Sequence, residues 1–315
     1  MISLEKNKNL PKVSIMIPTY NQELFIADAI QSALAQDYGN LEIIISDDCS
    51  SDNTGKIAQQ FLKDSRVKYY KNTQNLGRVG NYHKMLYDYV SGDWIVNLDG
   101  DDYYTDNQFI SKAINAIQQI DSNSVVAYLA QHNVTKIKKK IDCKKIDNHT
   151  ILLRGLTYFY HYFKIRNFSH LGTLYKREAA MQINAYTKNY LAADFETLMR
   201  LFITGDVILS DYIIGKWRVH ANNETTRLSA DNKYEDTLKA FDDITDFANS
   251  YGDPQKNNIW YKKAKKAAYS AYIQNYIIYS PPKKNRIKML KLLAKNFRFS
   301  REYLRLWYYY LSKKL

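Results

Sequence analysis

Three carboxylates lie close together directly after an apolar, strand-like run. Asp99, Asp101 and Asp102 fall within the stretch 97–102, which follows the apolar run 94–96. Carboxylates at the carboxyl end of a strand place hard oxygen ligands where a divalent cation and a polyphosphate can meet. The cluster therefore indicates chemistry on a nucleotide.

Two further strand-like runs also end in polar loops. The run 41–45 leads into Asp47 and Asp48, and the run 13–17 leads into the loop 18–21. The carboxyl ends of parallel strands in an open α/β sheet border one crevice. We therefore expect these loops and the carboxylate cluster to share it.

The elements that would position these loops alternate between strands and helices. Apolar periodicity predicts strands at 13–17, 41–45, 67–70 and 94–98. It also predicts helices at 23–36 and 81–90, and the N-cap residues at 51–54 predict a further helix from 51 onward. Such alternation predicts a mostly parallel sheet covered by helices. Further along we expect helices at 107–120, 151–164 and 191–203, strands at 124–130, 171–175, 207–209 and 213–219, an exposed basic loop at 136–145 and a mainly helical C-terminal part.

The composition is that of a globular protein. The chain has 315 residues, of which 45% are hydrophobic and 24% charged. It has no run of about 18 uncharged apolar residues, so a membrane-spanning helix is not expected. The first 12 residues lack the apolar core of a signal peptide, and we expect a cytoplasmic protein. Cys49 and Cys143 have no spacing typical of a disulfide framework or a zinc site, and no role is assigned to them.

The positive charge is concentrated in the C-terminal part of the chain. Residues 255–315 hold 16 of the 45 Lys and Arg residues and one of the 32 acidic residues, which leaves 29 basic and 31 acidic residues elsewhere. Within 287–298, apolar and basic side chains fall on different sides of a helix, as in a helix that lies on an anionic membrane. Two alternatives are internal helical packing or an oligomer contact, and a nucleic-acid surface, which is the least favoured.

Five motifs follow one another between residues 18 and 102. They are Pro18-Thr19-Tyr20-Asn21, the loop 47–54, Asn75-Leu76-Gly77 with Asn81, Gly92-Asp93-Trp94, and Leu98-Asp99-Gly100-Asp101-Asp102. In this order they resemble the family-2 glycosyltransferases, whose GT-A type fold binds nucleotide-diphosphate sugars. The resemblance extends less sharply to 172–180, 193–196 and 217–220 and fades after about residue 225.

The resemblance implies an α/β fold of the GT-A type, which is Rossmann-like, with a mixed, mostly parallel sheet flanked by helices. It implies a glycosyltransferase domain at 1–225, with a nucleotide-sugar-binding half at 1–110 and an acceptor-binding half at 111–225. Residues 226–315 then form a basic, aromatic helical extension.

The resemblance also implies which residues bind the donor. Tyr20 would stack on the base, and Asp48 would accept a hydrogen bond from the base or the ribose. The full implied set is Pro18, Thr19, Tyr20, Glu23, Asp47, Asp48, Asn75, Gly77, Arg78, Asp99 and Gly100. Local alternatives stay open: Asp47 and Asp48 as an Asx turn and helix cap, Glu23 as a helix-start acid, and Gly77 as a turn glycine.

A metal site and a catalytic base are implied in the same way. Asp99 to Asp101 matches the DXD motif, with Asp101 as the direct ligand of Mn²⁺ or Mg²⁺, Asp99 beside it, and His220 as a third ligand or a phosphate contact. A solvated turn is the alternative for this cluster. Asp194 would take the proton of the acceptor hydroxyl. The family usually has an acidic pair at 193–194, and because this chain has Ala193, Glu196 is the alternative base. The other five histidines are assigned no role.

The resemblance, together with these residues, implies an inverting, metal-dependent glycosyltransferase. It would move a hexose or N-acetylhexosamine from a nucleotide-diphosphate donor, by preference a UDP-sugar, to a saccharide acceptor in surface polysaccharide or lipid-linked oligosaccharide synthesis. The protein would be cytoplasmic or peripheral on the inner face of the cell membrane, and its oligomeric state is left open.

Two rival functions are less well supported by the residues. A nucleotidyltransferase acting on sugar phosphates needs a Gly-rich, basic phosphate loop after its first strand, and 18–21 does not supply one. A non-enzymatic nucleic-acid-binding protein would use the basic C-terminal part but would leave the acidic crevice unexplained.

Overall fold

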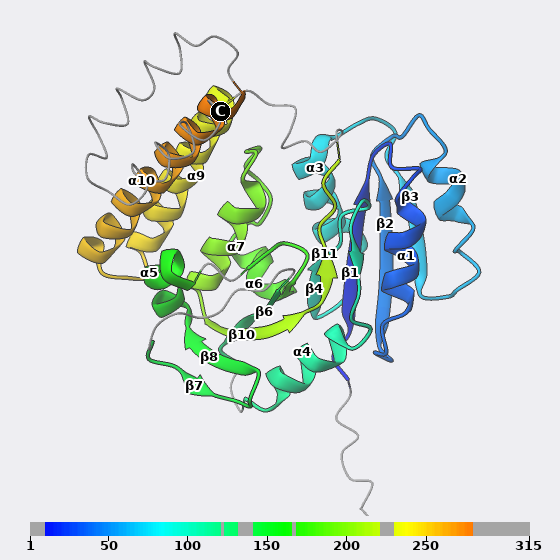
Figure 1. Ribbon diagram of the computed structural model, residues 1–315. Coiled ribbons are helices and arrows are strands. Elements are labelled where there is room, and N and C mark those ends of the chain that lie inside the picture. The colour runs from blue at the N-terminus through cyan, green and yellow to red at the C-terminus, as the bar shows by residue number, and fades with distance from the viewer. Residues whose placement is uncertain (1–9, 121–122, 132–140, 166–167, 221–229, 280–315) are drawn as a thin grey trace, which may run out of the picture.

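A nine-stranded sheet runs through the whole molecule (Figure 1). The computed structural model describes residues 10–120, 123–131, 141–165, 168–220 and 230–279. The strands are β1 (Val13–Thr19), β2 (Leu41–Asp47), β3 (Val67–Lys71), β4 (Trp94–Asn97), β6 (Val125–Gln131), β7 (Lys144–Lys145), β8 (Thr150–Arg154), β9 (Thr173–Lys176) and β10 (Asp206–Ile213).

The strand order is β3-β2-β1-β4-β9-β6-β10-β8-β7. The pairings make seven of these strands run in one direction, while β8 and β9 run the opposite way. The prediction of a mixed, mostly parallel sheet flanked by helices is therefore confirmed. A separate two-stranded ribbon pairs β5 (Tyr103–Tyr104) with β11 (Gly215–Lys216).

Alternate residues of the central strands enter two hydrophobic cores, one on each face of the sheet. In β1, Ile15 and Ile17 enter the α1/α4 core, and Met16 enters the α7 core. The α1/α4 core is covered by α1 (Ile26–Leu34), α2 (Thr54–Gln59) and α4 (Phe109–Gln118). The α7 core is covered by α3 (Gly77–Lys84), its π-helical continuation η1 (Met85–Tyr89), α5 (Gly155–Ile165), α6 (Arg177–Gln182) and α7 (Ala193–Ile203). Burial on both faces explains why these strands read as continuous apolar runs.

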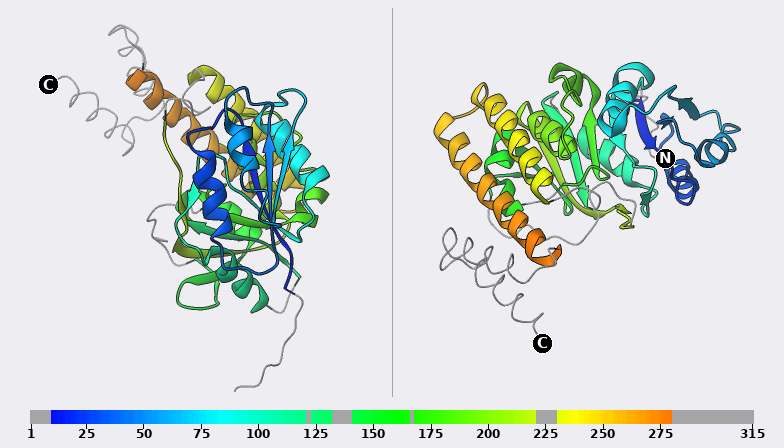
Figure 2. Two further views of the ribbon diagram at one scale, coloured as in Figure 1. Left: turned by 90° about the vertical axis from the view of Figure 1, so that its right-hand side faces the viewer. Right: turned by 90° about the horizontal axis from the view of Figure 1, so that it is seen from above.

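The C-terminal helices α9 (Ala230–Asn249) and α10 (Pro254–Tyr279) pack against α7 and α5. Figure 1 and the right-hand view of Figure 2 show them side by side, at the opposite end of the sheet from α1 and α2. Trp260 of α10 is 1% exposed and stacks on Phe159 of α5 with ring centroids 4.5 Å apart. The start of the basic segment thus contributes to the α7 core. None of the helices in the described ranges is both long and apolar enough to cross a bilayer.

Several element boundaries differ from the sequence-based expectation. The helix predicted at 151–164 begins only at Gly155, because 150–154 pairs with β10 as strand β8. Gly155 is required at this junction, since a Cβ there would lie 1.6 Å from the carbonyl oxygen of Phe202. The helix predicted at 81–90 begins at Gly77, and of the strand predicted at 213–219 only Ile213, in β10, and 215–216 are in strands. Of the predicted exposed loop 136–145, Lys144–Lys145 is exposed but forms strand β7, because it pairs with β8. Residues 136–140, the proposed boundary at 225, and 280–315 lie outside the described residues.

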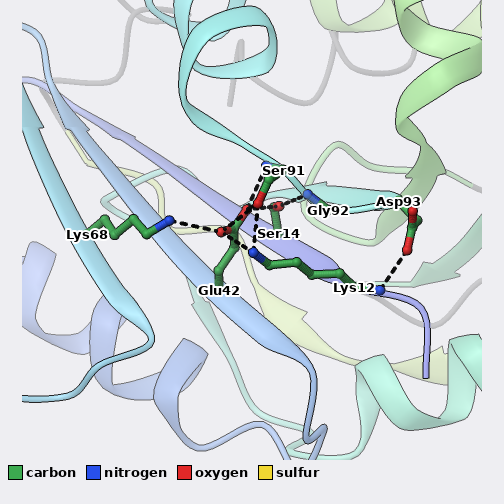
Figure 3. A network of polar contacts seen from close by, with 7 residues as sticks. All are labelled: Lys12, Ser14, Glu42, Lys68, Ser91, Gly92 and Asp93. Carbon is green, nitrogen blue, oxygen red and sulfur yellow. Dashed lines mark hydrogen bonds and ion pairs between the residues drawn. The ribbon is translucent and has the colours of Figure 1, made fainter. Parts of the chain in front are cut away.

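A buried carboxylate ties together the amino ends of β1, β2 and β4 (Figure 3). Glu42 is 3% exposed and accepts hydrogen bonds from the Ser14 hydroxyl at 2.6 Å and the Ser91 amide at 2.7 Å. Its other oxygen lies 2.8 Å from Lys12 Nζ. Burial alone would raise the pKa of Glu42, but the hydrogen bonds from Lys12, Ser14 and Ser91 outweigh it and lower this pKa to about 2.

Glu42→Gln should lower stability and remove part of its pH dependence. Because the pKa of Glu42 falls to about 2 on folding, the ionised carboxylate stabilises the fold above about pH 4.5, by roughly 3 kcal/mol, and this is lost as the pH falls toward 2. Urea unfolding at pH 7 and pH 3 should show a smaller pH effect in the variant. An unchanged difference between the two pH values would contradict this role.

Candidate active site

A cavity of about 830 Å³ opens at the carboxyl ends of β1, β2 and β4. The turn before β9 and the start of α7 form other parts of its wall. The predicted site residues that line it are Pro18, Thr19, Tyr20, Asp48, Asn75, Gly77, Arg78, Asp99, Asp101, Asp194 and His220. The shared crevice expected from the strand ends is thus present. Glu23, Asp47, Gly100 and Glu196 do not line it.

Asp47 and Glu23 hold the loop after β2 and do not face the cavity. Asp47 is fully buried, with Oδ1 accepting from the Ser50 amide at 2.8 Å and Oδ2 from the Tyr69 hydroxyl at 2.7 Å. Glu23 accepts from the Asn53 amide at 2.9 Å and from its side chain at 2.8 Å. For Asp47 the geometry matches the turn alternative, and neither carboxylate is placed where the predicted donor contact requires it.

Asp48 faces the cavity and orders the segment that leads into α3. Its Oδ1 accepts from the side chain of Asn72 at 2.9 Å and from the Leu76 amide at 2.8 Å, and the Asn75 side chain donates to its carbonyl oxygen at 3.2 Å. Gly77 has a φ of 75°, a conformation that L side chains adopt at a cost. This glycine lets the chain turn from Asn75 into the helix beside the cavity.

The carboxylate turn after β4 packs closely on the end of β1. A Cβ at Gly100 would lie 2.9 Å from Thr19 Oγ1, and the Gly100 amide donates to the Pro18 carbonyl at 3.1 Å. Gly100 therefore lets the turn pack directly against the end of β1. Asp99 accepts from the hydroxyl of Tyr82, a residue of α3, at 2.6 Å.

Three carboxylates within this turn repel one another in a largely dry environment. Burial, and then the charge of Asp99, raise the pKa of Asp101, and the same two causes raise the pKa of Asp102 to about 8. The Arg218 amide donates to Asp102 Oδ1 at 2.9 Å, and His220 Nε2 lies 2.9 Å from Asp101 Oδ2. These partners offset only part of the repulsion, so the turn favours a bound cation.

The described part of the chain holds no group of three or more His, Cys, Asp or Glu side chains already arranged as a metal site. The predicted set of Asp99, Asp101 and His220 is therefore not a complete protein cage. A carboxylate beside an imidazole is nevertheless a suitable donor set for Mn²⁺, and Mg²⁺ or Mn²⁺ commonly takes one or two carboxylates and completes its shell with phosphate and water. The residues fit a cation shared with a diphosphate.

Asp194, in the first turn of α7, lines the same cavity as the carboxylate turn. Its side chain is 33% exposed, and Arg78 Nη1 is 4.0 Å from its Oδ1. Arg78 also donates to the Leu191 carbonyl at 2.5 Å. This arginine reaches from α3 to the segment before α7, so it holds the two walls of the cavity together.

Glu196, the alternative base, is buried away from the cavity. It is 1% exposed and forms an ion pair with Arg200, whose Nε lies 2.5 Å from Glu196 Oε1. Arg200 also donates to the Ile183 carbonyl. The carboxylate of Glu196 therefore has a structural partner and no path to a substrate in the cavity.

Part of the cavity wall was missed in the sequence. The turn before β9 contributes His170, which had been assigned no role, with Ser169 and Leu171. Because β9 is antiparallel to β4, its amino end lies at the edge where the parallel strands have their carboxyl ends. Strand direction is the signal that would have found it. Other lining residues without an assigned role are Asn21, Gln22, Phe25, Asn81, Tyr82, Leu191 and Trp217.

Comparison with protein families matches residues 14–183 to the family described as "Glycosyl transferase family 2". A "GalNAc(5)-diNAcBac-PP-undecaprenol beta-1,3-glucosyltransferase" of Campylobacter jejuni is 40% identical over 113 residues, which is 35% of this chain and 34% of that protein. The "UDP-Glc:alpha-D-GlcNAc-diphosphoundecaprenol beta-1,3-glucosyltransferase WfgD" of Escherichia coli is 35% identical over 143 residues, which is 42% of this chain and 56% of that protein. The chain thus spans about a third to just over half of the length of these two relatives.

Two solved structures resemble the fold. The structure of Staphylococcus aureus TarS residues 1–349 in complex with UDP-GlcNAc superposes with a TM-score of 0.65 at 17% identity. The match covers 90% of this chain and 80% of the TarS chain. The mannosyltransferase PcManGT of Pyrobaculum calidifontis, in complex with GDP-Man and Mn²⁺, has a TM-score of 0.60 at 16% identity and covers 97% of this chain and 85% of that chain. At these identities the likeness concerns the fold alone.

Proposed function

This chain belongs to glycosyl transferase family 2, and from that premise we propose that it transfers a hexose or N-acetylhexosamine from a UDP-sugar to a saccharide acceptor. The acceptor is a lipid-linked oligosaccharide or a growing surface polysaccharide. One observation carries the proposal: a single cavity is lined both by the carboxylate turn after β4 and by Asp194 at the start of α7. The Campylobacter jejuni and Escherichia coli relatives are named for action on undecaprenol-diphosphate-linked saccharides, which supports the choice of acceptor.

In this proposal Asp194 is the general base. It takes the proton of the acceptor hydroxyl as that oxygen attacks the anomeric carbon from the side opposite the diphosphate. An α-linked donor then yields a β-linked product. Arg78 Nη1 lies 4.0 Å from Asp194 Oδ1, so a positive charge stands beside the proposed base.

The donor occupies the part of the cavity between β1, β2 and β4. Tyr20 is 48% exposed at the cavity, so its ring is available to stack on a base. Asp48 and Asn75 line the same part. The UDP-GlcNAc bound by the TarS structure supports a UDP-sugar as the donor.

Asp101 and His220, with Asp99 beside them, would hold Mn²⁺ or Mg²⁺ against the diphosphate. The bound cation supplies neutralisation of the negative charge that develops on the leaving diphosphate. The Mn²⁺ complex of the mannosyltransferase supports this assignment. Tyr82 orients Asp99 through its 2.6 Å hydrogen bond.

We also propose a division of labour along the chain. Residues 1–110 bind the donor, 111–225 bind the acceptor, and 226–315 form the helical extension of a cytoplasmic enzyme that binds the inner face of the membrane peripherally. Support comes from α10, where Lys262 and Lys263 are exposed and no acidic residue occurs. Such a surface suits anionic lipid headgroups near a lipid-linked acceptor.

The first prediction concerns the donor and the cation. Isothermal calorimetry with UDP, GDP, CDP and TDP and their common sugars should show Mn²⁺-dependent binding of a uridine nucleotide. Asp101→Ala should weaken this binding about tenfold or more, because a direct ligand of the cation is lost. Asp88→Ala, which removes a carboxylate that is 53% exposed and paired with Lys84, should bind like the wild type. Absence of binding for all four nucleotide classes would exclude the proposed donor site.

The second prediction separates the two candidate bases. Asp194→Asn should reduce turnover by about 10²-fold or more and leave UDP-sugar affinity unchanged, because a general base acts only in the chemical step. Glu196→Gln should keep its turnover but unfold at lower temperature, since Arg200 loses its buried partner at a cost of about 3 kcal/mol. The reverse pattern would make Glu196 the base.

The third prediction concerns the membrane. Deletion of α10 would remove Trp260 from the core, so substitution is the better test. Lys262→Gln/Lys263→Gln should weaken cosedimentation with phosphatidylglycerol vesicles about thirtyfold, because each lysine near an anionic surface contributes about 1 kcal/mol. Lys56→Gln/Lys63→Gln, at exposed positions in and just after α2, should bind the vesicles like the wild type. Equal binding by both variants would contradict docking through α10.

A further inference from the structure

His170 lies in the wall of the cavity that also contains the carboxylate turn and the proposed base Asp194. It is part of the turn before β9 and lines the cavity together with Asp99 and Asp194. The ring of His170 also packs edge-on against Tyr82, with centroids 5.1 Å apart, and Tyr82 donates to Asp99. The imidazole therefore borders the donor side of the cavity.

Behind His170, a chain of hydrogen bonds runs into the protein core. His170 Nε2 lies 3.0 Å from the Tyr186 hydroxyl, which lies 3.4 Å from the Tyr175 hydroxyl, which donates to Asn97 Oδ1 at 2.9 Å. Tyr186 and Tyr175 are 2% and 0% exposed, and Asn97 is 1% exposed. Because these three side chains are buried, solvent water cannot reach the hydrogen bonds between them and reverse their direction.

The chemistry of its last member orients this chain. The structure directs Asn97 Oδ1 at Tyr175 and leaves the buried Asn97 Nδ2 without a partner among the described residues. With the amide in this orientation, Tyr175 donates its single proton to Oδ1 and can only accept from Tyr186. Tyr186 then has no proton left for the imidazole. The Nε2 of His170 must carry the proton and donate it to Tyr186, which leaves the lone pair of the neutral ring on Nδ1.

The backbone of Tyr186 indicates that this arrangement is built at some cost. Tyr186 has a φ of 58°, a left-handed conformation that is unfavourable for a bulky residue. Its amide is held by the Thr197 hydroxyl at 3.2 Å, which anchors it to α7. Such strain persists only where the surroundings enforce it, and here it brings the hydroxyl under His170.

No group in the described ranges is recorded as a hydrogen-bond partner of His170 Nδ1, and burial lowers the pKa of His170, which favours the neutral ring. Resting on the proposed function, we propose that His170 Nδ1 accepts a hydrogen bond from a hydroxyl of the sugar that is transferred, so that His170 is a specificity-determining residue of the donor site. The transferred sugar, rather than the acceptor, is indicated by the contact with Tyr82 and hence with the carboxylate turn.

The first test reads the tautomer directly. In ¹⁵N spectra of the ligand-free protein, one of the six histidines should be neutral with the proton on Nε2, and its signals should be absent in His170→Asn. UDP-GlcNAc or UDP-glucose should shift its Nδ1 resonance, and UDP alone should not. An Nδ1-protonated ring, as expected if the Asn97 amide were turned round, would overturn the proposal.

The second test reads the hydrogen bond through affinity. His170→Leu should weaken UDP-sugar binding about tenfold and leave UDP binding unchanged. His170→Asn, which keeps an acceptor close to Nδ1, should lose less than threefold. Tyr186→Phe should lose several-fold because Nε2 no longer has an acceptor. Tyr160→Phe, whose hydroxyl donates to Asn257 Oδ1 at 3.0 Å and does not line the cavity, should lose nothing.

The outcomes distinguish the two levels of the proposal. If UDP itself does not bind, the proposed function fails, while the tautomer of His170 is still decided by the spectra. If UDP and UDP-sugars bind and His170→Leu reduces both equally, the residue supports the fold and the inference fails. If His170→Leu changes only the KM of the acceptor, the assignment to the transferred sugar is overturned.

Discussion

The main constraint on the cavity is the electrostatic repulsion among three carboxylates that lie in one turn. Asp99, Asp101 and Asp102 lie in the turn that follows β4, and burial and mutual repulsion raise the pKa values of Asp101 and Asp102. Tyr82, the Arg218 amide and His220 each offset part of this repulsion. The negative charge that they leave uncompensated is what the proposed cation would neutralise.

The two edges of the sheet handle buried charge in opposite ways. At the amino ends of the strands, Glu42 is satisfied within the protein by Lys12, Ser14 and Ser91, and its pKa is lowered to about 2. At the carboxyl ends, the carboxylates face a cavity of about 830 Å³. The first edge holds β1, β2 and β4 in register, and that register fixes where their loops lie at the second edge.

The two walls of the cavity come from segments far apart in the chain. Arg78 of α3 holds the segment before α7, and the ribbon of β5 and β11 brings Arg218 and His220 over the carboxylate turn. The antiparallel strand β9 adds His170 beside them. The C-terminal helices pack on α7 and α5, so the basic segment begins as part of the α7 core and not as a detached tail.

The sequence by itself determined the fold class and the strand-end loops that line one side of the cavity, because both follow from local patterns: apolar runs with the strand period, and polar loops where those runs end. It placed Asp47 and Asp48 together in the donor site, and it preferred Asp194 as the base without excluding Glu196. Each pair lies within three residues, and a small rotation about a strand or helix decides which carboxylate faces the cavity and which meets Tyr69 or Arg200. The place of His170 in the cavity wall was also decided by tertiary structure alone, since the direction of β9 depends on pairings with β4 and β6 that no local pattern encodes.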